Sequence, residues 1–171
     1  ILWADLTFSW FAGAHATLAA LFSKLFCKKS IVVAGGGDAV NMPEINYGLS
    51  LSPLGKYFPL YTYLLSSRIL AFSESSKRSI LDNYTARALV ETAYLGIDTI
   101  KFTPEGLKDN LVITVGVVSK PNLKRKGLET FVKAAEYLED AKFVLIGEPR
   151  GDSIAYLENI RTKNVELVGY L

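Results

Sequence analysis

Short apolar runs alternate along this sequence with longer stretches in which apolar residues recur at helical spacing. The apolar runs predict strands at residues 5–9, 31–34, 68–72, 90–95, 111–115, 143–146 and 165–168. The stretches between them predict helices at residues 10–27, 60–65, 73–84, 128–139 and 154–161. This alternation is typical of α/β proteins, in which parallel sheets are covered by helices on both faces.

The predicted helices carry their large apolar residues on one face. In the first helix these residues are Leu18, Leu21, Phe22, Leu25 and Phe26. In the two later helices they are Leu128, Phe131, Val132, Ala135 and Leu138, and then Ile154, Leu157 and Ile160. Each stripe is expected to pack on a core. A membrane span over the first helix is disfavoured, because the stretch is shorter than the ~20 apolar residues that a span needs.

The pattern lapses once, between two series of strands and helices. Residues 97–110 contain Pro104, Gly106 and several charges in place of the apolar rhythm. We therefore expect parts of two Rossmann-like domains, at residues 1–100 and 111–171, joined by a linker at residues 101–110. The abrupt apolar start, without Met or a leader pattern, predicts that the first strand is entered midway.

Composition limits the kinds of site and partner that we expect for this chain. Half of the residues are hydrophobic, which favours packed domains over disorder. A net charge of +2 is too small to indicate a nucleic-acid partner. Cys27 is the only cysteine and His15 the only histidine, so neither a disulfide, a metal site nor a Ser-His-Asp triad is expected. Cys27 is interpreted as a small buried apolar side chain, and the chain as a protein of a reducing, cytoplasmic compartment.

A local basic segment is the strongest chemical signal. Gly116 follows an apolar strand, and Lys120, Lys124, Arg125 and Lys126 come before a helix that opens at Gly127. The carboxyl ends of parallel strands are where open α/β sheets bind ligands, and glycine lets the backbone approach a ligand closely. Fixed cations and a helix start suit an anion, and a diphosphate fits best. A solvated basic loop is the alternative that these residues leave open.

The order of motifs resembles the large retaining glycosyltransferase family called GT4. The resembling residues are Val115-Gly116, Lys126-Gly127, the apolar strand ending in Gly147, and the strand and glycine at Val165–Gly169. Upstream, residues 94–98 followed by Phe102 and Pro104 resemble the family's signature between its domains. The series extends over most of the second half of the chain, and no single motif in it is decisive.

The resemblance implies a GT-B fold, in which the second domain binds a nucleotide-sugar and the first binds the acceptor. It implies that Lys126 contacts the donor diphosphate, with Arg125 as a second cation, and that Gly116 and Gly127 give backbone access. Gly147, Glu148 and Gly169 would lie near the nucleoside. Gly36, Gly37 and Asp38 are the candidate acceptor-side positions in the first domain, and His15 is a further one that could equally be a plain helix residue.

Several positions depart from the family's pattern. Val117 stands where many relatives have arginine, and Leu95 where asparagine is common. The family's cleft histidine is replaced by glycines at residues 35–37. The resemblance also places the family's paired glutamates beyond the last strand of this sequence, so no catalytic residue is assigned and the chain alone is expected to be inactive.

The sequence therefore predicts a hexosyltransferase that uses a UDP- or GDP-linked sugar and a glycan or lipid acceptor, with no metal or other cofactor. A sugar-nucleotide epimerase of the same fold and a non-catalytic nucleotide-sugar-binding protein are the alternatives. A dinucleotide-dependent dehydrogenase is weaker, because Gly35-Gly36-Gly37 lacks the spacing of the fingerprint loop. Peripheral contact with the inner face of the membrane is left open.

Overall fold

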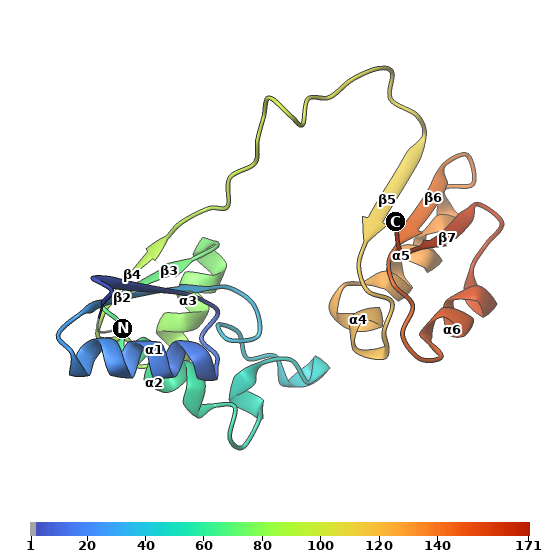
Figure 1. Cartoon of the computed structure of the whole chain (residues 1–171). Helices are drawn as coiled ribbons and strands as arrows, with labels where there is room; N and C mark the ends of the chain where they lie inside the picture. The colour runs from blue at the N-terminus through green and yellow to red at the C-terminus, as the bar shows by residue number, and fades with distance from the viewer. Residues whose placement is uncertain (1–2) are drawn as a thin grey trace. The chain divides into compact units, whose positions relative to one another are not determined.

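A computed structural model describes residues 3–171 and divides the chain into two compact units (Figure 1). The first unit is Ile1–Thr99 and the second is Ile100–Leu171. Between the last strand of the first unit and the first strand of the second, at residues 93–110, the chain forms no helix or strand. None of the helices in the described part of the chain combines the length and the apolar character needed to cross a membrane.

The first unit is a four-stranded parallel sheet with the strands in chain order, β1-β2-β3-β4. The strands are β1 (Leu6–Trp10), β2 (Lys29–Ala34), β3 (Arg68–Ala71) and β4 (Leu89–Thr92). The helices are α1 (Ala14–Leu25), α2 (Tyr57–Leu65) and α3 (Glu74–Asn83), with short 3-10 turns η1 (Pro43–Ile45) and η2 (Leu49–Leu51). All four predicted strands and all three predicted helices are confirmed, with ends shifted by a few residues.

The helices of the first unit lie on one face of its sheet, as Figure 1 shows. Helix residues Ala16, Tyr63 and Ile80 share one buried cluster with Val32 and Ile69 of the sheet. The prediction of helices on both faces is therefore wrong for this unit. Right-handed crossovers place every helix on the same face when the strand order never reverses, and here it runs 1-2-3-4.

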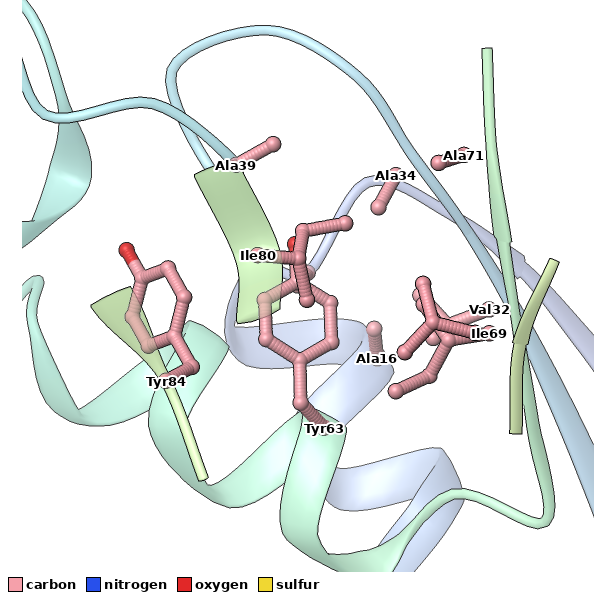
Figure 2. Packing of buried hydrophobic residues seen from close by; sticks show 11 residues of the cluster. Ala16, Val32, Ala34, Ala39, Tyr63, Ile69, Ala71, Ile80 and Tyr84 are labelled. Atoms are coloured by element: carbon pink, nitrogen blue, oxygen red, sulfur yellow. The ribbon is translucent and has the colours of Figure 1, made fainter. Parts of the chain in front are cut away.

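The core of this unit combines two tyrosines with aliphatic residues such as Ile69 and Ile80 (Figure 2). Tyr63 is fully buried, and its ring meets that of Tyr84 edge to face at a centroid distance of 5.2 Å. Small residues such as Ala16, Ala34 and Ala71 surround them. These small side chains let the helices approach the sheet closely enough for the rings to fill the space between.

The face of α1 that was predicted to pack on the core is exposed instead. Leu18, Leu21, Phe22, Leu25 and Phe26 are all at least 40% exposed. Its buried residues are Ala16, Ala20 and Ser23. The small-residue face allows α1 to pack closely against α2, where the Thr17 and Thr62 hydroxyls are 2.9 Å apart. The prediction that the large apolar residues of α1 pack on the core is thus wrong. Two faces of α1 lack charged residues, and the face with the smaller side chains is the one that is buried.

The end of α1 forces Cys27 into the left-handed region, at a φ of 55°. The Lys28 N–H donates to the Ser23 carbonyl at 2.7 Å and the Cys27 N–H to that of Lys24 at 3.2 Å, which is a Schellman cap. Cys27 is exposed, so its interpretation as a buried residue is wrong. Glycine is the residue that this cap position favours.

We expect Cys27→Gly to raise the free energy of unfolding of the first unit by about 0.5 kcal/mol, since relief of left-handed strain exceeds the entropy that glycine adds to the unfolded chain. Cys27→Ala keeps the strain and should change nothing. Urea unfolding followed by tryptophan fluorescence measures this, because both tryptophans, Trp3 and Trp10, are in this unit. Equal stabilities of the glycine and alanine variants would show that the cap is unstrained.

The second unit is a three-stranded parallel sheet of order β5-β6-β7. Its strands are β5 (Leu111–Val115), β6 (Lys142–Ile146) and β7 (Val165–Gly169), and its helices are α4 (Lys120–Arg125), α5 (Leu128–Ala134) and α6 (Ser153–Ile160), with a 3-10 turn η3 (Ala135–Tyr137) after α5. Leu128, Val132 and Leu157 are fully buried in one cluster with Phe143 and Leu145. Both α5 and α6 therefore pack on one face of this sheet too, which again corrects the expectation of two covered faces.

Two local features of the second unit differ from the sequence prediction. The basic segment is the short helix α4 and not a loop. The following helix gives way to the 3-10 turn at Ala135, and Leu138, which was placed on its buried face, is 56% exposed. The predicted packing of Ile154, Leu157 and Ile160 is confirmed, since all three contact the core.

Candidate functional site

Three glycines end the three strands of the second sheet side by side. The Gly116 N–H, just after β5, donates to the Ile146 carbonyl at 2.9 Å. The Gly147 N–H, just after β6, donates to the Gly169 carbonyl of β7 at 2.7 Å. Parallel pairing thus brings Gly116, Gly147 and Gly169 into one row at the carboxyl edge, where such sheets bind ligands.

The backbones of this row are in direct contact at one point. A methyl carbon on Gly147 would lie 1.9 Å from the Gly116 carbonyl oxygen and 2.6 Å from its carbonyl carbon. Beyond the row the two connections continue in register, since the Val118 N–H donates to the Glu148 carbonyl at 2.9 Å and the Arg150 N–H to that of Val118 at 2.8 Å. Only glycine fits at residue 147 without moving main chain.

Lys126 folds over the start of this row. A methyl carbon on Gly116 would lie 2.9 Å from Lys126 Cδ and 3.2 Å from its ammonium nitrogen. Lys126 is the C-cap residue of α4. Gly127 follows it in the left-handed region, at a φ of 67°, and α5 begins at the next residue. The turn at Gly127 therefore points the Lys126 side chain back toward the strand end. Lys126 is exposed, whereas Gly116 beneath its side chain is buried.

The second predicted cation, Arg125, is held within its own helix. Its guanidinium donates twice to the Asn122 amide oxygen, at 2.9 and 2.8 Å. The Asn122 amide nitrogen donates in turn to the Val117 carbonyl at 2.7 Å. Asn122 is buried, and it was missed by the sequence reasoning. The only hint in the sequence is that Asn122 is an uncharged polar residue among cations. That hint identifies a contact with Arg125 only once residues 120–125 are known to form a helix.

The carboxylates near the basic helix are already paired. Glu129 accepts hydrogen bonds from the Lys133 ammonium at 2.6 Å and from the Tyr156 hydroxyl at 2.9 Å. Lys133 first, and then Tyr156, hold the pKa of Glu129 below its usual range. Glu148 pairs with Arg150 at 2.9 Å, so this predicted nucleoside contact is engaged within its own turn. Both carboxylates thus have cationic partners of their own, and the Lys126 ammonium lies beside Gly116.

The acceptor-side candidates gather at the carboxyl edge of the first sheet. Asp38 is 2% exposed, and its carboxylate accepts from the Ala12 N–H at 2.8 Å, the Tyr63 hydroxyl at 3.3 Å and the Gly35 N–H at 3.4 Å. Burial first, and the Asp38 charge second, raise the pKa of Tyr63, so its hydroxyl keeps the proton it donates. Asp38 thus ties the connection after β1 to the connection after β2.

The remaining acceptor-side candidates are more open. The Nε2–H of His15 donates to the Trp10 carbonyl at the end of β1, at 2.9 Å, and the residue is exposed. Gly36 and Gly37 are half-buried beside the Tyr47 ring, and Gly36 has a φ of 144°. The same edge carries an aromatic cluster that sequence reasoning missed, in which Trp10 and Phe72 have a centroid distance of 5.7 Å.

Solved structures share this arrangement of elements. TarM matches 84% of this chain with a TM-score of 0.59 at 13% identity. MnaA of S. aureus, solved with UDP, matches 98% with a TM-score of 0.52 at 14% identity. The UDP-N-acetylglucosamine 2-epimerase of Rickettsia bellii matches 98% with a TM-score of 0.50 at 11% identity. The chain has a GT-B-like fold.

The similarity is one of fold, and it covers part of each relative. This chain spans 28% of the length of TarM, 47% of MnaA and 46% of the Rickettsia epimerase. A second TarM structure, of a mutant form of the S. aureus protein, contains fondaparinux, α-GlcNAc-glycerol and UDP. A scan against protein-family models and a search of curated proteins found no match.

Proposed function

We propose that the second unit binds the diphosphate of a nucleotide-sugar, and that the chain belongs to a glycosyltransferase. The observation that supports this most directly is the Lys126 ammonium lying over Gly116, in a row of three strand-ending glycines. A diphosphate is compact and doubly charged, so it needs both an unobstructed backbone and a fixed cation. Gly127 would orient the lysine, Gly147 would let the ends of β5 and β6 lie in direct contact, and Gly169 would leave room for the nucleoside.

This arrangement fits the chemistry of glycosyl transfer. When the bond from the sugar to the diphosphate breaks, negative charge grows on the leaving phosphate. A cation already in place stabilises that charge in the transition state more than in the ground state. Asn122 would hold the Arg125 side chain in a fixed position at the C-terminal end of α4, as a second cation for the same anion. UDP or GDP is the expected leaving group.

In the first unit, we propose that the carboxyl edge receives the glycan or lipid acceptor. Gly36, Gly37 and His15 would present backbone and imidazole groups to it. Asp38 would act as a positioning residue, because its buried carboxylate is occupied by the two connections that form this edge.

An epimerase that acts on UDP-sugars is the second candidate function. It is supported by the match of MnaA and of the Rickettsia epimerase to 98% of this chain, against 84% for TarM. The two functions share the diphosphate site and differ in product. With the longer protein, a transferase forms sugar product only with acceptor present, whereas an epimerase alters the sugar without one.

The diphosphate site is tested by Lys126→Ala. We expect UDP to bind this variant roughly thirtyfold more weakly, because a charge-assisted contact worth about 2 kcal/mol is lost. The matched control is Lys163→Ala, which removes the same charge from an exposed position before β7, at the opposite edge of the sheet. Isothermal titration calorimetry gives both affinities. If the two variants bind UDP equally well, Lys126 does not hold the diphosphate.

A further inference from the structure

A basic pocket lies at the amino edge of the first sheet. It has a volume of about 300 Å³. Its lining includes Lys24 at the end of α1, Lys28 in the connection that follows and Lys29 at the start of β2, together with Ser66 and Ser67 from the α2–β3 connection. Because β2 begins at Lys29 and β3 at Arg68 and the two run parallel, this pocket is at the edge opposite to Gly36 and Asp38. It belongs neither to the acceptor-side edge nor to the glycine row.

The pocket carries three positive charges with little to offset them. Lys28 forms an ion pair with Asp5 at 3.6 Å, and the Asp5 side chain is fully exposed, so this pair is weak. Within the described part of the chain, no ion pair involves Lys24 or Lys29. Like charges on three residues that line one pocket repel one another, and an anion bound there would reduce that repulsion.

Ser66, which lines the same pocket, adds a hydroxyl group that has no hydrogen-bond partner. The residue is only 7% exposed. Its backbone is fixed, because the Ser66 N–H donates to the Thr62 carbonyl at 2.9 Å and the neighbouring Ser67 N–H to that of Ser30, also at 2.9 Å. Buried hydroxyls are nearly always paired, so an unpaired one beside three lysines is suited to an anionic acceptor.

We propose that this pocket is a binding site for the phosphate group of a phosphorylated ligand. The charges of three lysines less that of Asp5, which pairs with Lys28, leave +2 beside the pocket, which suits a phosphate monoester of charge about −2. The Ser66 hydroxyl would donate to one of its oxygens. The volume exceeds that of phosphate alone, so part of the attached group enters as well. The phosphate comes either from a soluble metabolite or from the headgroup of a lipid, whose apolar part would meet the exposed Phe22 and Leu25 of α1.

The first test titrates the whole chain with inorganic phosphate while amide NMR shifts are followed. We expect saturable shifts at Lys29, Ser66 and Ser67. The variant Lys24→Gln/Lys29→Gln should bind phosphate at this site at least tenfold more weakly. Its control, Lys56→Gln/Lys77→Gln, removes the same charge from the same unit outside the pocket and should bind as the unaltered chain does. Equal weakening in both variants, or no shifts at Ser66 and Ser67, overturns the proposal.

Ser66→Ala separates a ligand contact from a structural role. Because the hydroxyl is buried and unpaired, its removal should leave the unfolding midpoint unchanged or higher, while phosphate affinity falls several-fold. A lower midpoint with unchanged affinity contradicts the site. Vesicles of phosphatidylcholine with and without phosphatidic acid then identify the source. Binding that needs phosphatidic acid and is lost in the lysine variant assigns a lipid headgroup, and binding of inorganic phosphate alone assigns a soluble ligand.

The result is independent of the diphosphate site in the second unit. Lys126→Ala should leave the phosphate-induced shifts at Ser66 and Ser67 intact, and the pocket variant should leave UDP affinity intact. Loss of both signals in either variant would mean that a single anion site had been measured twice, which also overturns the proposal.

Discussion

Gly147→Ala is expected to destabilise the second unit by about 3 kcal/mol and to abolish its binding of UDP. The added methyl carbon would lie 1.9 Å from the Gly116 carbonyl oxygen. No side chain can move aside to relieve this contact, because both neighbours are main chain of adjacent strands. β5 and β6 must separate at their carboxyl ends, which breaks the hydrogen bond from the Gly116 N–H to the Ile146 carbonyl. Overpacking that displaces a backbone is among the costliest single changes.

Gly151→Ala is the matched control for this prediction. Gly151 also belongs to the second unit and has a φ of 61°, but a methyl group there meets no atom within 4 Å. Its replacement should cost about 1 kcal/mol through backbone strain alone and leave UDP binding unchanged. Amide hydrogen exchange of β6 measures the local stability, and calorimetry measures UDP binding. Equal exchange rates in the two variants would contradict the contact between Gly147 and Gly116.

The ends of the strands were predictable from the sequence because local chemistry determines them. Each of β5, β6 and β7 is an apolar run that stops at a glycine, and parallel neighbours bring such ends to one edge. Local chemistry indicated the basic segment as a whole, and Lys126 was singled out within it only by the resemblance to the GT4 family. That its side chain folds back over Gly116 depends on the geometry of the turn, which sequence spacing does not specify.

The orientation of α1 shows that a periodic pattern alone does not determine which face of a helix is buried. Leu18, Phe22 and Leu25 lie on one face, and Ala16 and Ala20 on another that is also free of charge. Periodicity favours the face with the larger side chains, but the space between α1, α2 and the sheet admits only the smaller ones. The choice depends on contacts with residues about 40 positions away, so no window of local sequence contains it.

The same limit applies to the sheets and to the polar contacts. Alternating strands and helices indicate parallel pairing, yet whether helices cover one face or two depends on whether the strand order reverses. Asn122 and Asp38 are single polar residues in unremarkable local surroundings. Asp38 gains its role from the Ala12 N–H and the Tyr63 hydroxyl, which are 26 and 25 positions away along the chain. Such roles become visible only after the chain has folded.

Asp38→Asn is expected to destabilise the first unit by about 3 kcal/mol, because hydrogen bonds to a buried charge are lost together. Asp38 Oδ2 accepts from the Ala12 N–H and the Tyr63 hydroxyl, and Oδ1 accepts from the Gly35 N–H. An amide of the same shape must turn its NH₂ group toward one of these donors, which leaves two donors facing each other. At 2% exposure, solvent cannot replace the missing acceptor. The connections after β1 and β2 should then separate.

Four further variants, one of them a double variant, show whether this carboxylate acts through the hydrogen bonds described. Glu44→Gln removes an exposed carboxylate from the same unit and should change its stability by less than about 0.5 kcal/mol. Tyr63→Phe removes one donor to Asp38 and should cost about 1 kcal/mol, whereas Tyr61→Phe, on the exposed side of the same helix, should cost almost nothing. Tryptophan-detected urea unfolding gives each value. The Tyr63 hydroxyl lies 3.3 Å from Asp38 Oδ2 and 3.3 Å from the Asp38 carbonyl oxygen, which Asp38→Asn leaves in place. The costs in the double variant Asp38→Asn/Tyr63→Phe should therefore add only in part, since the two changes share the contact at Oδ2. Strict additivity would show that Tyr63 and Asp38 stabilise the unit independently, and the connections would then be held by the Ala12 and Gly35 contacts alone.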